Sequence, residues 1–554
     1  MAPKGRRGPL FEHAFSPQDA VLRDASRRLG RRRFLTVSAA AAALAFGAGA
    51  PARGASAARE RPAARITDNP FTLGVASGDP LPDSVVLWTR LAPQPFEPDG
   101  GLGQERVAVS WEVALDEFFL FTAQRGVAQA HPEYGHSVHV DVQGLDPGTE
   151  YHYRFRVGTW FSPAGRTRTA PAAGTAPKGL RLAAVSCQAY HDGYFTAHRH
   201  LAEDDVDVVV HVGDYLYEYA VDPAGGARGY TDVELPDVFN RETETLADYR
   251  LRYALYKADP DLQAVHAAHP FVLTWDDHET ENNYAGAADE KGGPAEAFLI
   301  RRAAAYRAYW ENQPLREAQR PDGPDARLYR RLHWGTLAQL DVLDTRQYRS
   351  DQAYGGGPHA PGPESDDAAR TITGVAQERW LADGWKASTA VWNVMPQQVC
   401  FSQRRFGTAA DANVSMDAWD GYRASRKRVT AAATAAGVEN WLVLTGDVHV
   451  GYAFDIKENF DDPASRTVGT EITTTSVTSG RDGTERPSDW ATYMAANPHL
   501  KWYDGRRGYV RVELGAKEAR ADFKVVPAVT KPGASITTAA SFVTEAGAPG
   551  LNPA

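Results

Sequence analysis

The sequence is poor in features that could crosslink the chain or anchor it in a membrane. Two cysteines among 554 residues, Cys187 and Cys400, cannot form a disulfide framework, so packing must stabilise the fold. An apolar run at 37–50 has fourteen residues, fewer than the roughly 20 that span a bilayer. A composition of 43% hydrophobic and 23% charged residues excludes disordered and collagen-like chains. The sequence therefore predicts a globular protein with a large core.

Several catalytic motifs are also absent. The chain has no GxSxG elbow of a serine esterase, no Walker A Gly-Lys pair and no dinucleotide fingerprint after a strand. The HxK sequence at 499–501 is followed by Asp504, two residues too early for the HxKxxxxD pattern of one phospholipase class. Any phospholipid cleavage by this chain would therefore use metal-assisted hydrolysis rather than a phosphohistidine.

The N-terminus predicts export. Residues 24–35 read DASRRLGRRRFL, the apolar run follows, and residues 55–57 give a small-x-small cleavage pattern. The RRRFL sequence at 31–35 resembles a twin-arginine signal. We therefore assign residues 1–57 to a twin-arginine signal peptide and exclude them from the fold. We expect a secreted, extracellular protein that engages the twin-arginine translocase during export.

The rest of the chain is acidic. Residues 1–57 hold ten Lys/Arg and three Asp/Glu, so the formal net charge of the rest falls from the −10 of the whole chain to −17. An acidic surface repels polyphosphate backbones, so no specific nucleic-acid binding is expected. Twin-arginine export moves folded proteins, which permits metal loading before secretion and favours a metalloprotein.

Residues 68–170 predict a small β-sandwich domain. Short β-type runs such as SVVLWTRL at 84–91 and RVAVSWEVAL at 106–115 alternate with turns. The stretch GLDPGTEYHYRFRV at 144–157 resembles a fibronectin type III or immunoglobulin-like domain, in which a tyrosine lies near a strand start. A Pro/Gly/Ala linker at 171–178 ends this domain.

Strands and helices alternate over residues 179–530. Buried strands are predicted at GLRLAAVSC, VDVVVHVGD, HPFVLTWDDHE and ENWLVLTGDVH, and helical periodicity lies between them. RGYVRVELG and ARADFKVVP predict a closing hairpin, and the tail at 531–554 is expected to be peripheral. The predicted fold is an α/β sandwich of two mixed sheets flanked by helices, with sites at the strand ends and the β-sandwich domain at its N-terminus.

Motifs able to bind metal follow four predicted strands. They are SCQ at 186–188, GDYLY at 213–217, DDHE at 276–279 and GDVH at 446–449. A single acid after a strand is as often a helix N-cap as a ligand. Acids that converge at sheet ends would repel one another unless a cation neutralised them. The set of four therefore predicts a metal centre.

The chain resembles the PhoD-type alkaline phosphatases and phosphodiesterases in the ordered motifs SCQ, GDYLYE, TWDDHE, LDTRQYR and GDVH, and in FTLGVASGDPLPDSVVLWTR at 71–90. This family is a branch of the calcineurin-like metallophosphatase superfamily and includes secreted metal-dependent phospholipase D enzymes. The resemblance covers nearly the whole chain after residue 57. It implies a phosphoric ester hydrolase with a PhoD-like metallophosphatase domain at 179–530.

The resemblance also implies two kinds of metal. Thiolate and phenolate donors suit ferric iron, and a carboxylate-rich pocket suits calcium or another hard divalent ion. The expected cofactors are therefore Fe³⁺ and Ca²⁺. The ligands implied for the first metal are Cys187, Asp214, Tyr217 and His449, and those for the second are Asp214 as a bridge, Asp277, Asp447 and the further candidate Asp276.

Two residues gain catalytic roles from the resemblance. His278 would hydrogen-bond the transferring phosphoryl group or protonate the leaving oxygen, or else orient a ligand. Arg346 in the DTR motif would clamp phosphate through its guanidinium. The alternative for Arg346 is an ion pair with Asp341 or Asp344.

Other histidines are expected to lie outside the metal centre. The run His198-Arg199-His200 has the pattern of a solvated helix face. His266 and His269 have metal-binding spacing at i and i+3 of a helix, but no acid lies beside them, so we interpret them as structural.

The leading hypothesis is a secreted, metal-dependent hydrolase of phosphate mono- and diesters that acts through a metal-activated hydroxide. Phospholipase D-like cleavage of phospholipid headgroups is the alternative within this class, and a cell-wall polymer is a further candidate substrate. A non-catalytic secreted binding module is the alternative of another class. We expect a monomer without a transmembrane segment.

Overall fold

The computed structural model describes residues 66–221, 228, 235–409 and 411–554. Residues 63–554 form one compact unit, and the predicted signal peptide at 1–57 lies outside the described residues. Over the described ranges, no helix combines the length and hydropathy needed to cross a bilayer.

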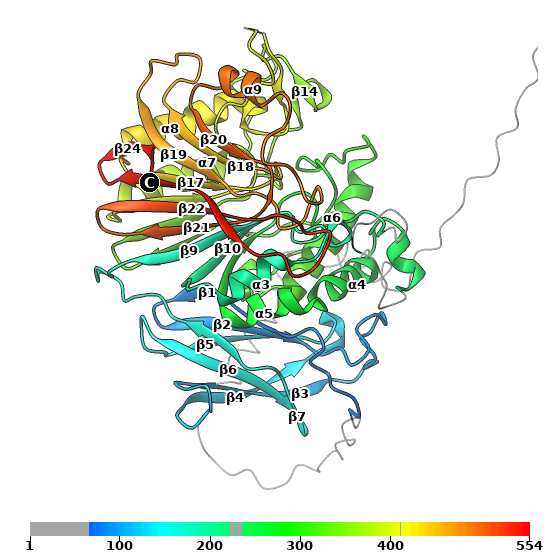
Figure 1. Ribbon diagram of the computed structural model, residues 1–554. Helices are drawn as coiled ribbons and strands as arrows, with labels where there is room; N and C mark the ends of the chain where they lie inside the picture. Colours follow the sequence, from blue (N-terminus) through cyan, green and yellow to red (C-terminus); the bar gives the residue numbers. More distant parts are fainter. Residues whose placement is uncertain (1–65, 222–227, 229–234, 410) are drawn as a thin grey trace, which may run out of the picture. The chain divides into compact units, whose positions relative to one another are not determined.

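The larger of two main sheets has ten strands (Figure 1). In order across the sheet they are β24 (Ala548–Pro553), β23 (Thr537–Glu545), β22 (Glu518–Val526), β21 (Arg507–Leu514), β9 (Leu180–Val185), β10 (Val208–Val212), β11 (Pro270–Thr274), β1 (Val75–Leu81), β2 (Ser84–Arg90) and β5 (Ser137–Gln143). Strands β9, β10, β11 and β1 run parallel, and the strands on either side of this group pair antiparallel. Three of the predicted buried strands are therefore confirmed as β9, β10 and β11.

The second main sheet has seven strands. In order they are β12 (Arg330–Trp334), β13 (Ala338–Val342), β15 (Trp392–Pro396), β17 (Trp441–Thr445), β19 (Thr467–Thr473), β18 (Gly451–Lys457) and β20 (Leu500–Asp504). Strands β13, β15, β17 and β19 are parallel, and the outer strands are antiparallel. The predicted strand at ENWLVLT is β17. A separate two-stranded ladder joins β14 (Pro358–His359) to β16 (Val414–Ser415).

The two main sheets share a hydrophobic core. In β9, Leu182 and Ala184 pack in the core that also holds residues of the second sheet, whereas Ala183 and Val185 pack in the core that holds the helices. Burial on both faces explains why the parallel strands are continuous apolar runs in the sequence. This confirms the prediction of mixed sheets flanked by helices.

Helices cover the outer faces of both sheets. Those packed in the core of the ten-stranded sheet are α3 (Thr196–Glu203), α4 (Leu246–Lys257), α5 (Pro260–Ala268) and α6 (Ala295–Asn312), those on the second sheet are α7 (Val375–Ala387) and α8 (Arg423–Ala435), and a short α9 spans Trp490–Ala496. Helix α4 begins with a capping box, because the Thr245 side chain accepts from the Asp248 N–H while the Asp248 side chain accepts from the Thr245 N–H.

The N-terminal region is a two-layer β structure. A five-stranded sheet contains β4 (Thr122–Ala130), β3 (Val107–Ala114), β6 (Glu150–Val157), β7 (Trp160–Phe161) and β8 (Gly165–Arg168). Its core is shared with β1, β2 and β5, which belong to the ten-stranded sheet, so the region at 68–170 is joined to the rest by a continuous sheet. Near the start of β6 the Tyr151 hydroxyl accepts from the Asp146 N–H at 2.9 Å. The fibronectin-like or immunoglobulin-like topology remains a prediction.

The C-terminal strands correct one prediction. The predicted closing hairpin is present as β21 and β22. The tail at 531–554 is not peripheral, because β23 and β24 extend the ten-stranded sheet beyond β22. Phe542 and Leu551 are buried in the core between the main sheets.

Candidate metal centre

The predicted ligands lie where strands of both sheets end. Cys187 follows β9, Asp214 follows β10, Asp277 follows β11 and Asp447 follows β17, while His449 lies just before β18. A parallel bridge between Ser186 and Ser476 connects the ends of β9 and the segment after β19. Because carboxyl ends of parallel strands share one edge, motifs far apart in the sequence meet here.

The ligand loops have unusual backbone geometry. Cys187, Asp214, Asp447 and His449 all have left-handed φ angles, of 58°, 55°, 67° and 59°. Such angles are uncommon for residues other than glycine and concentrate at functional sites, where the surrounding structure enforces them. Gly213 has a φ of 108°, and an added Cβ would lie 2.4 Å from the Asp276 Cβ, so only glycine permits the two loops to approach this closely.

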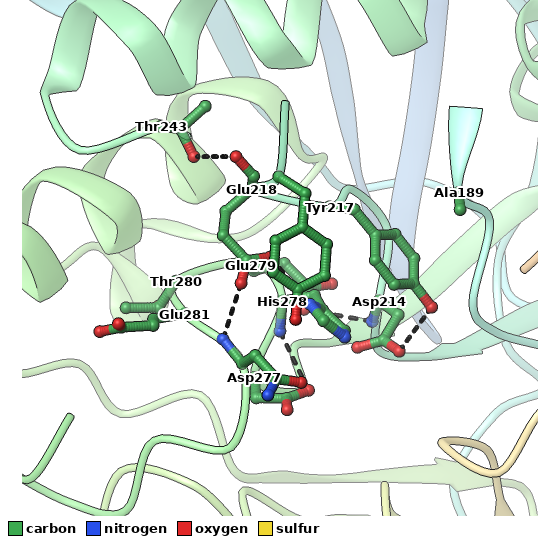
Figure 2. Close-up of polar contacts among 12 residues, drawn as sticks. Ala189, Asp214, Tyr217, Glu218, Thr243, Asp277, His278, Glu279, Thr280 and Glu281 are labelled. Carbon is green, nitrogen blue, oxygen red and sulfur yellow. Dashed lines mark hydrogen bonds and ion pairs between the residues drawn. The ribbon is translucent and has the colours of Figure 1, made fainter. Parts of the chain in front are cut away.

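The first cluster of donors, here called the thiol–phenol group, comprises Cys187, Asp214, Tyr217 and His449. One ligand atom from each of Cys187, Asp214 and His449 lies within 4.8 Å of the others. The Tyr217 hydroxyl donates to Asp214 Oδ2 at 3.0 Å and lies 3.0 Å from His449 Nε2. Figure 2 shows the phenol oxygen directed at the Asp214 carboxylate. The structure thus brings together the four residues predicted for the first metal.

The acid–base properties of this group favour a cation. Burial, then the Asp214 carboxylate, raises the pKa of the Cys187 thiol and of the Tyr217 phenol well above their usual values. Burial and nearby positive charges lower the pKa of His449 to about 3. The Asp214 Oδ1 atom is buried and has no hydrogen-bond partner among the described residues. A bound metal ion would satisfy this oxygen and stabilise the ionised thiol and phenol.

The second cluster, here called the carboxylate group, comprises Asp276, Asp277, Asp417 and Asp447 around Arg346. The guanidinium contacts Asp276 Oδ1 through Nε and Asp417 Oδ1 through Nη1, the latter at 2.7 Å. Its Nη2 lies 3.7 Å from Asp277 Oδ2 and 3.6 Å from Asp447 Oδ1. Asp276 Oδ2 is buried without a hydrogen-bond partner in the described structure, which leaves an oxygen available to a hard cation.

Arg346 has other ion-pair partners than those predicted for it. Its side chain is fully buried, and its role as a phosphate clamp stays a prediction. It is an ion-pairing residue, but its partners are not the predicted Asp341 and Asp344. Asp341 pairs with Arg331, and the Asp344 carboxylate accepts the Arg346 backbone N–H at 3.0 Å. Sequence proximity suggested the wrong partners, because the loops after β11 and β16 supply the acids.

His278 lies beside both groups and is held by a glutamate. Its Nδ1 lies 2.8 Å from Glu218 Oε2, and its ring centroid lies 4.1 Å from that of Tyr217, with the two ring planes tilted by 31°. Ligand atoms of Asp214, Asp277 and His278 lie within 4.8 Å of one another. Although burial opposes it, the carboxylates of Glu218, Asp277 and Asp214 raise the pKa of His278 well above its usual value. Since Nδ1 faces Glu218, Nε2 is the ring atom left to face a substrate.

Glu279 joins two ligand loops through their backbones. Its carboxylate accepts from the N–H groups of Asp214 at 3.1 Å, Tyr215 at 2.7 Å and Asp276 at 2.9 Å. Burial raises the pKa of Glu279 to about 8, although the backbone N–H groups of Tyr215 and Asp276 oppose the shift. Glu279 thus fixes the spacing between the loops after β10 and β11.

Three other histidines lie outside the donor groups. His198 is fully buried and contacts Gln188 Oε1 at 2.7 Å, so the prediction of a solvated helix face is wrong for this residue. His266 Nε2 lies 2.8 Å from the Tyr215 hydroxyl, and His269 Nε2 lies 3.0 Å from the Leu201 carbonyl. These contacts agree with the structural interpretation of His266 and His269.

Four residues near the donors had no role assigned from the sequence. Glu218 and Glu279 lie inside the quoted motifs GDYLYE and TWDDHE, but their partners come from other loops. Asp417 and Ser479 lie outside every motif. The Ser479 hydroxyl donates to the Tyr217 hydroxyl at 2.7 Å. Only the folded arrangement identifies these contacts, since no local pattern encodes them.

Comparison with known proteins decides the family. Residues 182–523 match the PhoD-like phosphatase family, and residues 55–171 match the PhoD-like phosphatase, N-terminal domain. The chain belongs to the PhoD-like phosphatase family. Alkaline phosphatase D of Bacillus subtilis (strain 168) is 47% identical over 493 residues, which cover 88% of this chain and 83% of that protein.

A solved structure of PhoD agrees with this family assignment. It matches with a TM-score of 0.85 and 46% identity, over 88% of this chain and 92% of that chain. The donor groups described above lie within the part of the chain that matches the PhoD-like phosphatase family.

Proposed function

We propose that this PhoD-like phosphatase hydrolyses phosphate esters at the two donor groups with the help of metal ions. The observation that carries the proposal is the convergence of Cys187, Asp214 and His449, and of Asp214 with Asp277 and His278, each set within 4.8 Å. Asp214 belongs to both sets, as a bridging ligand would. The relative from Bacillus subtilis is named alkaline phosphatase D, which supports the same chemistry.

The donor chemistry supports a different ion in each group. The thiol and phenol of the thiol–phenol group suit Fe³⁺, whereas the carboxylate oxygens of the other group suit Ca²⁺ or another hard divalent ion. When bound, such ions would supply positive charge to the transferring phosphoryl group and would lower the pKa of water toward that of a nucleophilic hydroxide. The buried oxygens without partners on Asp214 and Asp276 fit this occupancy.

Three side chains near the donor groups have separate proposed roles in catalysis. We assign proton donation to the leaving oxygen to His278, whose Nε2 faces away from Glu218. Glu218 keeps the ring in place, because its other oxygen accepts the Asn282 N–H at 2.8 Å. Arg346 balances the carboxylate group, so it acts on substrate through the acids it pairs with.

Several finer features belong to the same proposal. We propose secretion through the twin-arginine pathway and activity on both monoesters and diesters, from the N-terminal RRRFL pattern and the family resemblance. Phospholipid headgroups and cell-wall polymers are candidate substrates, because both contain phosphodiesters. A monomer is the proposed state.

The deciding experiment compares rates on p-nitrophenyl phosphate, bis-p-nitrophenyl phosphate and phosphatidylcholine, with and without calcium. We expect hydrolysis of at least one nitrophenyl ester, loss of the rate in excess EGTA and recovery on addition of calcium. Iron should stay bound through this cycle and be detected by elemental analysis. Inactivity on all three substrates would contradict the enzyme proposal, and full activity in EGTA would contradict a labile calcium ion.

A further inference from the structure

The β3–β4 hairpin ends in an apolar tip that points into solvent. The exposed fractions are 54% for Leu115, 71% for Phe118, 75% for Leu120 and 67% for Phe121. These four side chains, here called the apolar tip, come from the seven-residue turn between β3 and β4 of the N-terminal five-stranded sheet. Figure 1 labels both strands. A cluster of large apolar side chains at solvent is costly, so it indicates a binding surface.

The turn holds the apolar tip in one conformation. The Asp116 carboxylate accepts from the N–H groups of Phe118 at 3.0 Å, Leu120 at 3.1 Å and Phe121 at 2.7 Å. These bonds satisfy the turn's backbone without any contact that would bury the side chains. The turn is therefore ordered by its own hydrogen bonds, and its apolar side chains remain exposed to solvent.

Arginines lie on the sheet beside the tip. A hollow of about 500 Å³ on this sheet is lined by Arg125, Arg154 and Arg156 together with the aromatic rings of Trp111 and Phe161. The Arg154 guanidinium covers the ring of Phe119 at 4.0 Å and pairs with Glu112. Three arginines against one glutamate make this lining positive, although the chain as a whole carries a net charge of −10.

We propose that the apolar tip and the neighbouring arginines bind the surface of an anionic phospholipid bilayer. Apolar side chains at the tip would enter the boundary between headgroups and acyl chains, and the arginines would contact lipid phosphates. Guanidinium groups suit this contact because their planar donors match phosphate oxygens. The proposal is independent of the metal centre, since none of these residues belongs to either donor group.

Shape and charge favour a bilayer over a protein partner. A protein interface of stable size needs an extended complementary surface, whereas here the most exposed apolar side chains sit at the end of one narrow turn. The turn presents the exposed apolar side chains together with the acidic Asp116 and Glu117, and the arginines lie on the strands that lead away from it. This order matches a bilayer, in which the acyl chains lie inside and the phosphates outside. Binding to a second copy of this chain is the competing outcome that the test must detect.

The test measures sedimentation of the full chain with vesicles. One set of vesicles contains phosphatidylcholine alone and the other adds phosphatidylglycerol. The test variant is Phe118→Ser/Leu120→Ser/Phe121→Ser. The matched control is Phe406→Ser, because Phe406 is an aromatic residue outside the hairpin whose exposed fraction is 45%. All proteins share the same N-terminal residues, so differences between them report the hairpin alone.

We expect wild type and Phe406→Ser to sediment with the anionic vesicles, and the triple variant to bind them about tenfold or more weakly, because three apolar side chains no longer enter the lipid. Circular dichroism and the rate on p-nitrophenyl phosphate should stay unchanged in the triple variant, since the substituted side chains are exposed. Should it fail to fold, Leu120→Ser alone makes the same comparison with a smaller expected effect. If the triple variant binds the anionic vesicles as tightly as wild type does, the proposal is overturned.

A second variant, Arg125→Gln/Arg156→Gln, tests the electrostatic part. This double variant should bind the anionic vesicles more weakly than wild type does, while its binding to phosphatidylcholine vesicles should be unchanged. Added salt should likewise weaken the binding of wild type to the anionic vesicles alone. If wild type sediments with neither kind of vesicle, the proposal is overturned. If sedimentation velocity then shows self-association that the triple variant loses, the tip is instead an interface between copies of this chain.

Discussion

The two donor groups of the metal centre differ in how their charge is balanced. The carboxylate group is built around Arg346, which contacts or approaches four aspartates. The thiol–phenol group has no cationic side chain among its members, and burial raises the pKa of its thiol and phenol so that both stay protonated without an ion. One group therefore contains its own counter-charge, whereas the cation beside Asp214 of the other group is His278, which lies outside that group.

This difference predicts different dependence on metal. A thiol and a phenol ionise in a buried site only beside a strongly charged ion, so the thiol–phenol group should hold its ion tightly and release protons on binding. Arg346 already neutralises part of the negative charge of the carboxylate group. A metal ion there should therefore bind less tightly and exchange more readily. The predictions below test this contrast, in order of decreasing effect.

Substitution of Asp214 should have the largest effect, because its carboxylate lies within 4.8 Å of ligand atoms of Cys187 and His449 and also of Asp277 and His278. Asp214→Asn takes a negative charge from the point where these two sets meet, so we expect activity to fall by about a thousandfold or more. Elemental analysis should show loss of both ions, while circular dichroism stays native-like. Activity within a few-fold of wild type would mean that Asp214 is not a ligand shared by the two metal ions.

The two cysteines provide a matched pair. Both are fully buried, but only Cys187 lies in the thiol–phenol group. Cys187→Ser should lose iron and about a hundredfold in activity together, because a thiolate donor is gone, whereas Cys400→Ser should keep both. A visible absorption band is expected in wild type and should shift or vanish in Tyr217→Phe. A colourless, iron-free but active wild type would remove ferric iron from the proposal.

Arg346→Gln tests the other group. It leaves Asp276 without its buried partner and Asp417 with Arg349 as its remaining ion-pair partner, so we expect the free energy of unfolding to fall by about 3–5 kcal/mol. Added calcium should recover more stability in this variant than in wild type, since the ion then supplies the missing charge. Thermal melting with and without calcium measures this, with Arg331→Gln as the control. Equal calcium effects in wild type and Arg346→Gln would show that the counter-charge is not shared with an ion.

Glu279→Gln should have the smallest effect. An amide nitrogen cannot accept, so at least one of the three backbone N–H groups loses its partner and the loops after β10 and β11 lose their fixed spacing. We expect activity to fall about tenfold through misplaced ligands. Glu281→Gln, two residues along, is the control and should stay close to wild type. Equal rates in both variants would assign Glu279 no positioning role.

The sequence predicted which motifs would meet better than it predicted the residues that hold them in place. Cys187, Asp214 and Asp447 follow apolar strands, and strand ends meet for a general geometric reason, so local motifs were sufficient to predict that these residues converge. Their role as metal ligands stays a prediction. Asp417 lies 71 residues from Arg346 in a loop without a motif, and their pairing depends on how distant loops fold together. The strands β23 and β24 were missed for a similar reason. Small and polar residues there form strands because β22 pairs with them, and intrinsic preference alone does not show this.

The left-handed backbone angles of Cys187, Asp214, Asp447 and His449 have a consequence for engineering. Glycine adopts these angles freely, so each position should store roughly 1 kcal/mol or more that a glycine would release. A library screened only for resistance to heat would therefore enrich glycine at these four positions and, if they bind metal as proposed, return stable but inactive proteins. Selection for a durable catalyst from this scaffold needs turnover in the same screen.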